Sequence, residues 1–145
     1  METDDIHYPP GFSLKDVVGW GNTGLVVLDA SSNTIIKTPL DEDYKPLIAR
    51  EEQIYERFTK KGGHHGILRY HGTFDSGIRL EYASNHHLRT VNNKGVSQNQ
   101  RLRWAVQIAE AIVFTHAAGV IHGDLSCANI FLDEDFNAKL GDFAG

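Results

Sequence analysis

The sequence predicts an α+β fold made of two halves, the first rich in strands and the second largely helical. Three short runs rich in Val, Ile and Leu lie between residues 14 and 38, a further strand pair lies between residues 68 and 83, and one helical segment separates the two groups. A long helical pattern follows from residue 98, and two short apolar runs flank a polar turn near the end. This order predicts a sheet with one helix, followed by a second helix and a small hairpin.

The first half begins with residues 1–13, which contain Pro9-Pro10-Gly11 and are expected to form a flexible lead. The turn Ala30-Ser31-Ser32-Asn33 joins the second and third strands as a hairpin, and Asp75-Ser76-Gly77 joins the last two. The expected strands are residues 14–20, 25–29, 33–38, 68–74 and 78–83.

Two helices are predicted from apolar residues that recur with helical period. The first spans residues 46 to about 61 and ends at Gly62-Gly63, because glycine commonly follows the end of a helix. The second spans residues 98–118 and ends at Gly119. One apolar stripe of this second helix consists of Leu102, Ala105, Val106, Ala109, Ile112, Val113 and His116.

Composition bounds the class of protein. The 145 residues suffice for one domain or two small lobes, and a net charge of −5 argues against a nucleic-acid or anionic-membrane partner. The longest apolar region, residues 104–121, contains Gln107, Glu110 and His116, so no membrane span is expected. Cys127 is the single cysteine, and the acidic start of the chain does not resemble a targeting peptide. A cytoplasmic location is therefore expected, with the nucleus as the alternative.

Residues 19–26, Gly-Trp-Gly-Asn-Thr-Gly-Leu-Val, match the pattern G-x-G-x-x-G-x-V. Glycines let a turn fold tightly and bring backbone N–H groups close to phosphate oxygens. A dinucleotide-binding loop would open onto a helix, but this one runs into the strand at residues 25–29, so that interpretation fails. The pattern favours a loop between two strands that covers phosphate groups.

A lysine and a glutamate are expected to pair in the first half. Lys37 alternates with Ile35 on a strand, so both side chains point to one face. Glu51 lies in the middle of the apolar stripe of the first helix. Since a buried charge requires a partner, we expect an ion pair between Lys37 and Glu51.

The segment after the second helix carries Asp124 and Asn129, and Asp142 follows the final hairpin. If residues 133–137 form the turn, pairing residue 130 with 140 puts Asn129 opposite Gly141, and Asp142 is then about 5 Å away. Mg²⁺ prefers a few protein oxygens together with substrate phosphates. Asn129 and Asp142 are therefore candidate metal ligands, and Asp124 is a candidate acceptor of a proton from a nucleophile.

With these motifs the chain resembles the first half of a eukaryotic-type protein kinase domain, over residues 14–145. The resemblance implies a two-lobe fold with a five-stranded antiparallel N-lobe over residues 14–84 and an incomplete helical C-lobe over 85–145. It also implies ATP and Mg²⁺ as cofactors and a protein as substrate. Because the activation segment and the A-P-E motif are missing, the chain is expected to be an N-terminal fragment whose second helix exposes its apolar stripe.

The resemblance assigns roles by position. Lys37 would hold the α- and β-phosphates and pair with Glu51, Asp124 would be the catalytic base, and Asn129 and Asp142 would bind the metals. Leu80 would be the gatekeeper, and Glu81-Tyr82-Ala83 the hinge, with Glu81 and Ala83 contacting adenine. The phosphate-covering loop would comprise Val18, Gly19, Gly21, Gly24 and Val26. The stacked regulatory spine would comprise Tyr55, Tyr70, His122 and Phe143.

Some residues depart from the protein kinase pattern. Gly123 stands where the family has the arginine of H-R-D, so control through a phosphorylated activation loop is not expected. Ser126 and Ala128 match neither serine/threonine nor tyrosine kinases, which leaves the acceptor class open.

Two other functions compete with that of a protein kinase. The loop H-G-D-L with Asn129 also resembles that of aminoglycoside and choline kinases, which act on small molecules. The motif Asp142-Phe143-Ala144-Gly145 and the complete glycine loop of residues 19–26 weigh against this alternative. A catalytically inactive ATP-binding module is the remaining one. The missing second half weighs for it, and the retained side chains weigh against it, namely Lys37, Asp124, Asn129 and Asp142.

Overall fold

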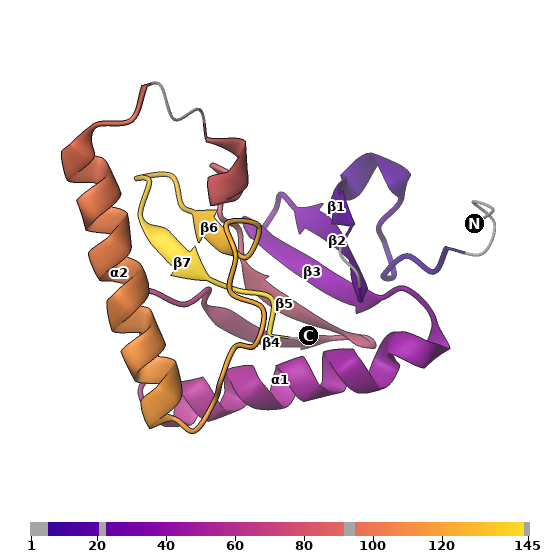
Figure 1. Cartoon of the computed structure of the whole chain (residues 1–145). Coiled ribbons are helices and arrows are strands. Elements are labelled where there is room, and N and C mark those ends of the chain that lie inside the picture. The colour runs from indigo at the N-terminus through magenta and orange to yellow at the C-terminus, as the bar shows by residue number, and fades with distance from the viewer. Residues whose placement is uncertain (1–5, 21–22, 92–94, 144–145) are drawn as a thin grey trace. The chain divides into compact units, whose positions relative to one another are not determined.

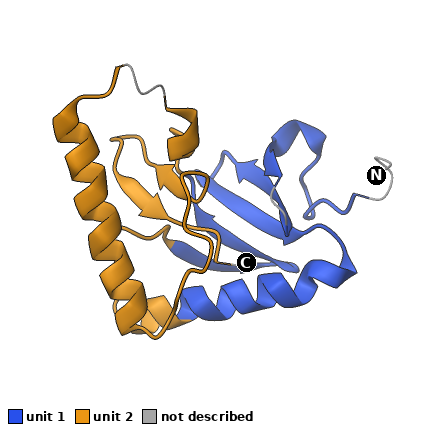
Figure 2. Cartoon of the chain, in the orientation of Figure 1, with its two compact units in different colours: residues 1–56, 70–82, 144–145 blue, residues 57–69, 83–143 orange. Residues whose placement is uncertain are grey.

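The computed structural model describes residues 6–20, 23–91 and 95–143 (Figure 1). These residues form two compact units (Figure 2). The first comprises the chain up to residue 56 together with 70–82, and the second comprises 57–69 and 83–143. Segment 57–69 thus belongs to the second unit, although it precedes 70–82 of the first unit in the chain.

The first unit contains a five-stranded antiparallel sheet, as the sequence predicts. The strand order is β1-β2-β3-β5-β4, so each hairpin pairs neighbours and β5 lies beside β3. Residues 14–16, expected to extend the first strand, form a 3₁₀ turn instead, because Ser13 N–H donates to the Asp16 carboxylate at 2.9 Å. The strands are β1 Val17–Trp20, β2 Gly24–Asp29, β3 Thr34–Pro39, β4 Tyr70–Phe74 and β5 Gly77–Glu81.

Helix α1 spans Lys45–Lys60, close to the predicted bounds. Its buried residues are Ile48, Glu51, Tyr55 and Phe58, which recur with helical spacing. The helix ends where Gly63 N–H donates to the Phe58 carbonyl at 2.9 Å, and Gly63 adopts a φ of 69° that suits glycine.

The lead is packed in its described part, which differs from the flexible segment that the sequence predicts. Ile6, Tyr8 and Phe12 lie against the buried cluster of Leu25, Val27 and Ile36 on one face of the sheet. A turn at Pro9, whose carbonyl accepts from Phe12 N–H at 3.0 Å, brings Phe12 edge-on to Phe74 at 5.9 Å between ring centroids. The lead thus covers the apolar face of the sheet, because the side chains of Leu25, Val27 and Ile36 would otherwise be exposed to water.

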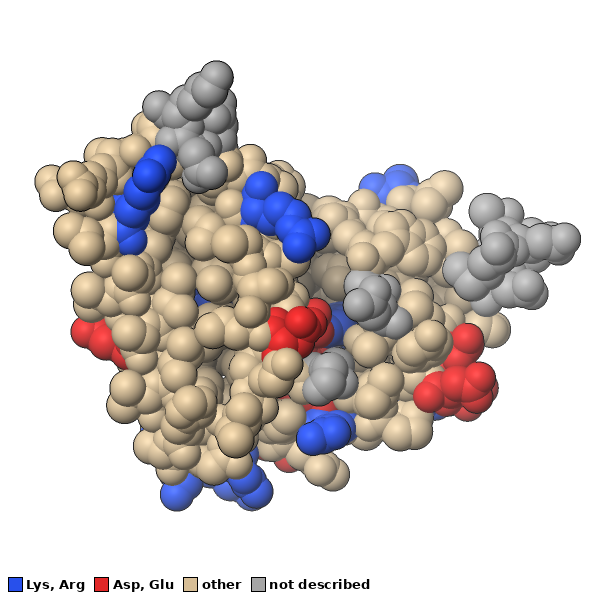
Figure 3. Space-filling view, in the orientation of Figure 1, with Lys and Arg blue, Asp and Glu red and all other residues tan. Residues whose placement is uncertain are grey.

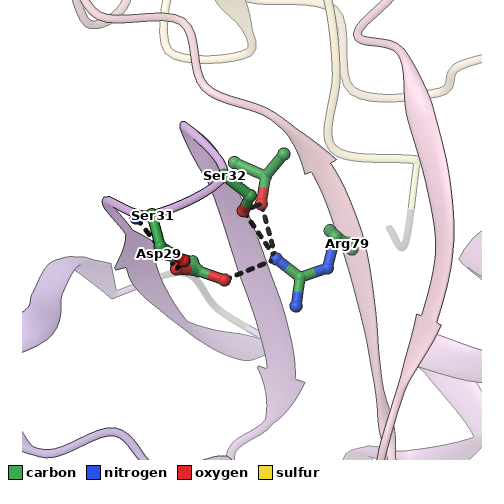
Figure 4. A network of polar contacts seen from close by, with 5 residues as sticks. Asp29, Ser31, Ser32 and Arg79 are labelled. Atoms are coloured by element: carbon green, nitrogen blue, oxygen red, sulfur yellow. Dashed lines mark hydrogen bonds and ion pairs between the residues drawn. The ribbon is translucent and has the colours of Figure 1, made fainter.

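Arg79 of β5 ties the β2–β3 turn to the sheet (Figure 4). Its Nη1 donates to Asp29 Oδ2 at 2.9 Å, to Ser32 Oγ at 3.0 Å and to Thr34 Oγ1 at 2.6 Å. Ser31 Oγ donates to Asp29 Oδ1 at 2.6 Å. These contacts to Ser31 and Arg79 lower the pKa of Asp29 to about 2.

The second unit contains helix α2, Gln98–Ala117, and the hairpin of β6, Ile130–Leu132, and β7, Ala138–Leu140. The helix begins at Ser97, whose Oγ accepts from Gln100 N–H at 3.1 Å. Ile130 pairs with Leu140 and Leu132 with Ala138, as predicted. No helix among the described residues is long and apolar enough to cross a membrane.

Segment 57–69 joins the second unit through rings and backbone. Phe58 lies 5.7 Å from Phe114 and 5.1 Å from Phe143, measured between ring centroids. Leu68 N–H donates to the Leu140 carbonyl at 3.0 Å, and Leu140 N–H donates to the Gly66 carbonyl at 2.8 Å. The segment therefore pairs with β7 although α1, from which it emerges, begins in the first unit.

Asp29→Asn is expected to lower stability at neutral pH and to flatten its dependence on acid. Because the pKa of Asp29 falls from 3.8 to about 2 in the fold, its contribution is present above about pH 3.8 and is lost as pH falls through 2. Urea unfolding between pH 2 and pH 7 measures this. Asp75→Asn, at an exposed turn of the same unit, is the control; equal acid sensitivity of D29N and the native chain would contradict the prediction.

Candidate active site

Lys37 and Glu51 form the ion pair that the sequence predicts. The distance from Lys37 Nζ to Glu51 Oε1 is 3.0 Å, and the two side chains are 9% and 0% exposed. On the sheet, Lys37 lies opposite Val26 of β2 and Ile78 of β5, so its side chain shares the face of these residues. Removing both charges from water is costly, and the close contact offsets much of that cost.

The glycine loop leads into β2 at Gly24, and the structure shows why glycine is needed there. A Cβ at Gly24 would lie 2.9 Å from the Thr38 carbonyl oxygen and 3.0 Å from Lys37 Cγ. The lysine stem therefore passes close to the backbone of Gly24. A Cβ at Gly19 would meet only Val26 Cβ, at 3.9 Å. Gly21 lies outside the described residues.

The other residues that the sequence predicts to contact the nucleotide differ in exposure and in their position in the fold. Val18 is 46% exposed, whereas Leu80 is 2% exposed and pairs with Ile35. Glu81 is the last residue of β5, and buried Ala83 begins the segment of the second unit that follows it. The predicted roles of these residues stay predictions.

The segment after residue 83 is fixed to the hairpin of the second unit. Asn85 N–H donates to the Leu132 carbonyl at 3.0 Å, and Leu132 N–H donates to the His86 carbonyl at 2.8 Å. Asn85 Nδ2 also donates to the Asp133 carbonyl at 2.8 Å. Burial, together with the nearby Arg89, lowers the pKa of His87 in this segment.

Asp124 and Asn129 are in direct contact. Asn129 Nδ2 donates to the backbone carbonyl of Asp124 at 2.7 Å and to its Oδ2 at 3.2 Å. Asn129 is buried, whereas Asp124 is exposed. Because the Asn129 amide nitrogen faces Asp124, its Oδ1 is the atom suited to bind a metal.

The hairpin brings Asn129 and the approach to Asp142 together as predicted. Gly141 N–H donates to the Asn129 carbonyl at 3.1 Å, so these residues are opposite each other. A Cβ at Gly141 would lie 2.6 Å from Leu68 Cδ1 and 2.8 Å from the Phe131 ring, which explains a glycine there. Asp142 follows with a φ of 57°, a strained conformation for an aspartate that is typical of functional sites.

His122 links the catalytic loop to the residue before Asp142. Its Nε2 lies 2.7 Å from the Gly141 carbonyl, and its Nδ1 lies 3.2 Å from Asp124 N. Since a carbonyl oxygen only accepts and a backbone N–H only donates, these contacts assign the hydrogen to Nε2. The imidazole therefore holds Asp124 and the approach to Asp142 in one arrangement.

The four residues of the predicted spine form two ring pairs, one in each unit. Tyr55 stacks on Tyr70 with centroids 5.9 Å apart, and His122 lies 4.7 Å from Phe143. Burial, together with nearby glutamates, raises the pKa of Tyr70 to about 12, so this phenol stays neutral. Phe143 is 2% exposed.

Sequence reasoning missed the residues of α2 that anchor the hairpin. Gln107 Oε1 accepts from Ala138 N–H at 2.8 Å, and its Nε2 donates to Asn137 Oδ1 at 2.9 Å. Trp104 Nε1 donates to the Phe136 carbonyl at 2.7 Å. One feature of the sequence could have indicated this role. Gln107 lies three residues after Trp104 and four before Ala111, so a polar side chain shares the helix face that carries these two buried residues.

The oxygen donors match a magnesium site that is completed by phosphate. Across the described ranges no group of three His, Cys, Asp or Glu side chains could enclose a metal. Asn129 and Asp142 offer an amide and a carboxylate oxygen, and Mg²⁺ commonly takes few protein ligands while keeping water and phosphate. The residues present therefore fit this ion when a polyphosphate accompanies it.

Glu51→Ala is expected to lower the free energy of unfolding by about 3–5 kcal/mol, because it leaves the Lys37 ammonium buried without its carboxylate. Urea unfolding measures the loss. Glu42→Ala is the matched control, since Glu42 pairs with Lys45 at 2.9 Å but is 84% exposed; an exposed pair contributes roughly 0–1 kcal/mol. Equal losses for the two variants would contradict the prediction.

Gly24→Ala is expected to cost about 1–3 kcal/mol of stability, because the added Cβ overlaps the β3 backbone. The same substitution at Gly19 meets ordinary van der Waals contact only, and it serves as the control. Thermal and urea unfolding of both variants test this. A G24A variant no less stable than G19A would refute the close approach of Lys37.

Comparison with known proteins identifies the family. Residues 12–144 match the family described as the protein kinase domain. The chain is 31% identical to serine/threonine-protein kinase ppk16 of Schizosaccharomyces pombe over 141 residues, which is 91% of this chain and 20% of that protein. Over 68 residues, 46% of this chain and 5% of the relative, it is 40% identical to probable serine/threonine-protein kinase ifkB of Dictyostelium discoideum.

A further relative is the eIF-2-alpha kinase GCN2 of Schizosaccharomyces pombe, 39% identical over 66 residues, which is 46% of this chain and 4% of that protein. The chain thus spans a fifth or less of the length of these three relatives. The family match covers nearly the whole chain and includes both the glycine loop and Asp142. This chain belongs to the protein kinase domain family.

Proposed function

We propose that this chain supplies the nucleotide-binding and catalytic-loop residues of an ATP- and Mg²⁺-dependent protein kinase. The observation that carries the proposal is the buried contact of 3.0 Å between Lys37 on β3 and Glu51 on α1. Protein kinases require a lysine–glutamate pair from these two elements when they transfer a phosphoryl group. A purely structural role would not need a charged pair at a position that apolar residues could fill.

Lys37 is proposed to bind the α- and β-phosphates of ATP. Its ammonium is held by Glu51, and its stem runs beside Gly24 at the base of the glycine loop. Backbone N–H groups of such a loop suit phosphate oxygens because glycine lets the main chain come close. Glu81, the last residue of β5, and buried Ala83 are proposed to bind adenine through backbone groups.

Asp124 is proposed to accept the proton of the attacking hydroxyl. Asn129 Nδ2 holds one oxygen of this carboxylate at 3.2 Å, and His122 receives its backbone N–H at 3.2 Å. These contacts orient an exposed side chain, which positions the base without burying it.

Asn129 and Asp142 are proposed to hold the metal. When bound, Mg²⁺ supplies positive charge that neutralises the phosphate oxygens. The chain contributes the orientation of the two ligands, through the Gly141–Asn129 backbone pairing and the left-handed conformation of Asp142.

The substrate is proposed to be a protein hydroxyl, and the names of the relatives favour serine or threonine. A small-molecule acceptor is the second candidate, because the loop carries glycine at position 123. Gly123 has a φ of 82° and open space around its Cβ position, so the loop conformation suits glycine. A phosphoryl-transfer assay that offers protein substrates, aminoglycosides and aminoalcohols in parallel distinguishes the two classes of acceptor.

Asp124→Asn is expected to lower the rate of phosphoryl transfer by about 10²–10⁴-fold, since the amide cannot take a proton. Affinity for Mg²⁺-ATP should stay within about twofold, because the amide oxygen can still accept from Asn129. Isotope transfer from ATP measures the first and calorimetry the second. Asp135→Asn, on the exposed turn of the same hairpin, is the control.

A D124N variant with native transfer would remove Asp124 from the proposed role. A native chain that binds Mg²⁺-ATP but transfers no phosphoryl group to any acceptor would favour the binding-only module instead. A chain that binds no nucleotide would contradict the whole proposal.

A further inference from the structure

A small pocket lies in the first unit, where three segments meet. The lead, the connection from β3 to α1 and the turn between β4 and β5 line it, and its volume is about 250 Å³. This volume is below the roughly 300–1,000 Å³ of sites that enclose a small-molecule ligand. The pocket therefore suits a single side chain. The lining residues that decide its chemistry are Tyr8, Thr38, Asp41, Glu42, Lys45 and Asp75.

Thr38 faces the lead and not the proposed nucleotide site. Neighbouring side chains of a strand point to opposite faces, so Thr38 points away from the face that carries Lys37. Thr38 lies opposite Leu25 of β2, and Leu25 belongs to the buried cluster that the lead covers. The pocket is thus separate from the lysine that is proposed to bind phosphate.

The hydroxyl of Thr38 offers a ligand a buried polar partner. Thr38 is 5% exposed and lines the pocket. Within the described part of the chain, no hydrogen bond uses its hydroxyl. Because buried hydroxyls ordinarily have a hydrogen-bond partner, a polar group that enters the pocket would supply the one that Thr38 lacks.

The charge of the pocket is negative. Its lining carries three carboxylates and one lysine, together with the imidazole of His7. Figure 3 shows acidic side chains gathered at the start of α1. Lys45 pairs with Glu42 at 2.9 Å, whereas no ion pair among the described residues involves Asp41 or Asp75. Two carboxylates from different segments are therefore left to attract a cation.

The form of the lining favours a guanidinium over an ammonium. Asp41 accepts from Asp43 N–H at 2.8 Å through Oδ1, which leaves its Oδ2 to a ligand. Half-buried Tyr8 adds an aromatic ring to the same pocket. A guanidinium donates to several acceptors from one plane and stacks on aromatic rings, whereas an ammonium acts as a point charge. These groups match the side chain of arginine.

We propose that this pocket binds an arginine side chain of a partner polypeptide. The guanidinium donates to the carboxylates of Asp41 and Asp75 and to the hydroxyl oxygen of Thr38, beside the ring of Tyr8. A free arginine would gain no partner for its charged α-ammonium and α-carboxylate in a pocket of this size, so a polypeptide is the proposed source. The proposal does not depend on nucleotide binding or on phosphoryl transfer.

A capped peptide tests the pocket directly. The probe is acetyl-Ala-Arg-Ala-amide, added to the ¹⁵N-labelled 145-residue chain and followed by NMR. Amide signals of residues 38–42 and 75–76 should shift, with a Kd of about 1 mM or weaker, because one side chain makes few contacts. The same peptide with lysine should bind more weakly. The peptide with citrulline, which keeps the shape of arginine but lacks the charge, should not shift these signals.

The double variant D41N/D75N is expected to raise this Kd at least about tenfold, because it removes both charged acceptors. Asparagine suits both positions, since it caps a turn as Asp41 does and accepts the φ of 57° or less that Asp75 adopts at 54°. Asp43→Asn is the matched control. Asp43 is exposed in the same 3₁₀ turn, Glu42–Tyr44, but does not line the pocket, so its Kd should stay within about twofold of the native value. Urea unfolding establishes that both variants are folded.

Several outcomes would overturn the proposal. An arginine peptide that shifts no signal of the pocket residues at tens of millimolar would remove the site. Equal shifts with the citrulline peptide, or equal loss of affinity in D43N and D41N/D75N, would remove the role of the two carboxylates. Equal affinity of the lysine peptide would contradict the choice of arginine, and tighter binding of free arginine than of the capped peptide would contradict a polypeptide as the source.

Discussion

The buried ion pair of Lys37 and Glu51 constrains more of the first unit than any other contact. A lysine at 9% exposure and a glutamate at 0% cannot both remain charged unless β3 and α1 hold their atoms together. This requirement fixes the face of α1 that meets the sheet, and buried Ile48 and Tyr55 lie about one turn to either side of Glu51 on that face. It also explains Gly24, because the lysine stem occupies the space that a Cβ would take. The orientation of α1 and the glycine at position 24 are thus both related to the contact between Lys37 and Glu51.

The sequence predicted the sheet, both helices and the hairpin because each depends on local periodicity or on a turn. It also predicted the register of Asn129 opposite Gly141, since a fixed turn length sets the pairing of a hairpin. The packed lead and the transfer of segment 57–69 to the second unit could not be predicted. Both depend on which apolar face remains to be covered, as at Phe12 on Phe74 and Phe58 on Phe143, and periodicity carries no such information.

Helix α2 shows the same limit more sharply. Its most regular apolar stripe is the exposed one, while the buried face combines Trp104 and Ala111 with the polar Gln107. Half-buried Gln107 faces the hairpin and accepts from the backbone N–H of Ala138, which no apolar residue could do. A pattern of hydrophobicity therefore finds the helix but not the side that faces the site. Which side chains of α2 hydrogen-bond to the hairpin depends on tertiary packing, and the periodicity of apolar residues does not indicate it.

Gly123 and Asp142 both have a positive φ, but this conformation strains the backbone only at Asp142. Gly123 has a φ of 82° and relieves the strain, so the loop reaches Asp124 at little conformational cost. Asp142 has a φ of 57° and bears the strain, because a glycine there would lack the carboxylate. His122 contacts both the backbone N–H of Asp124 and the carbonyl of Gly141, and it thereby stabilises the strained side. The role proposed for Asp142, a metal ligand that must point in one direction, would account for a left-handed aspartate directly after a glycine whose carbonyl a buried histidine contacts.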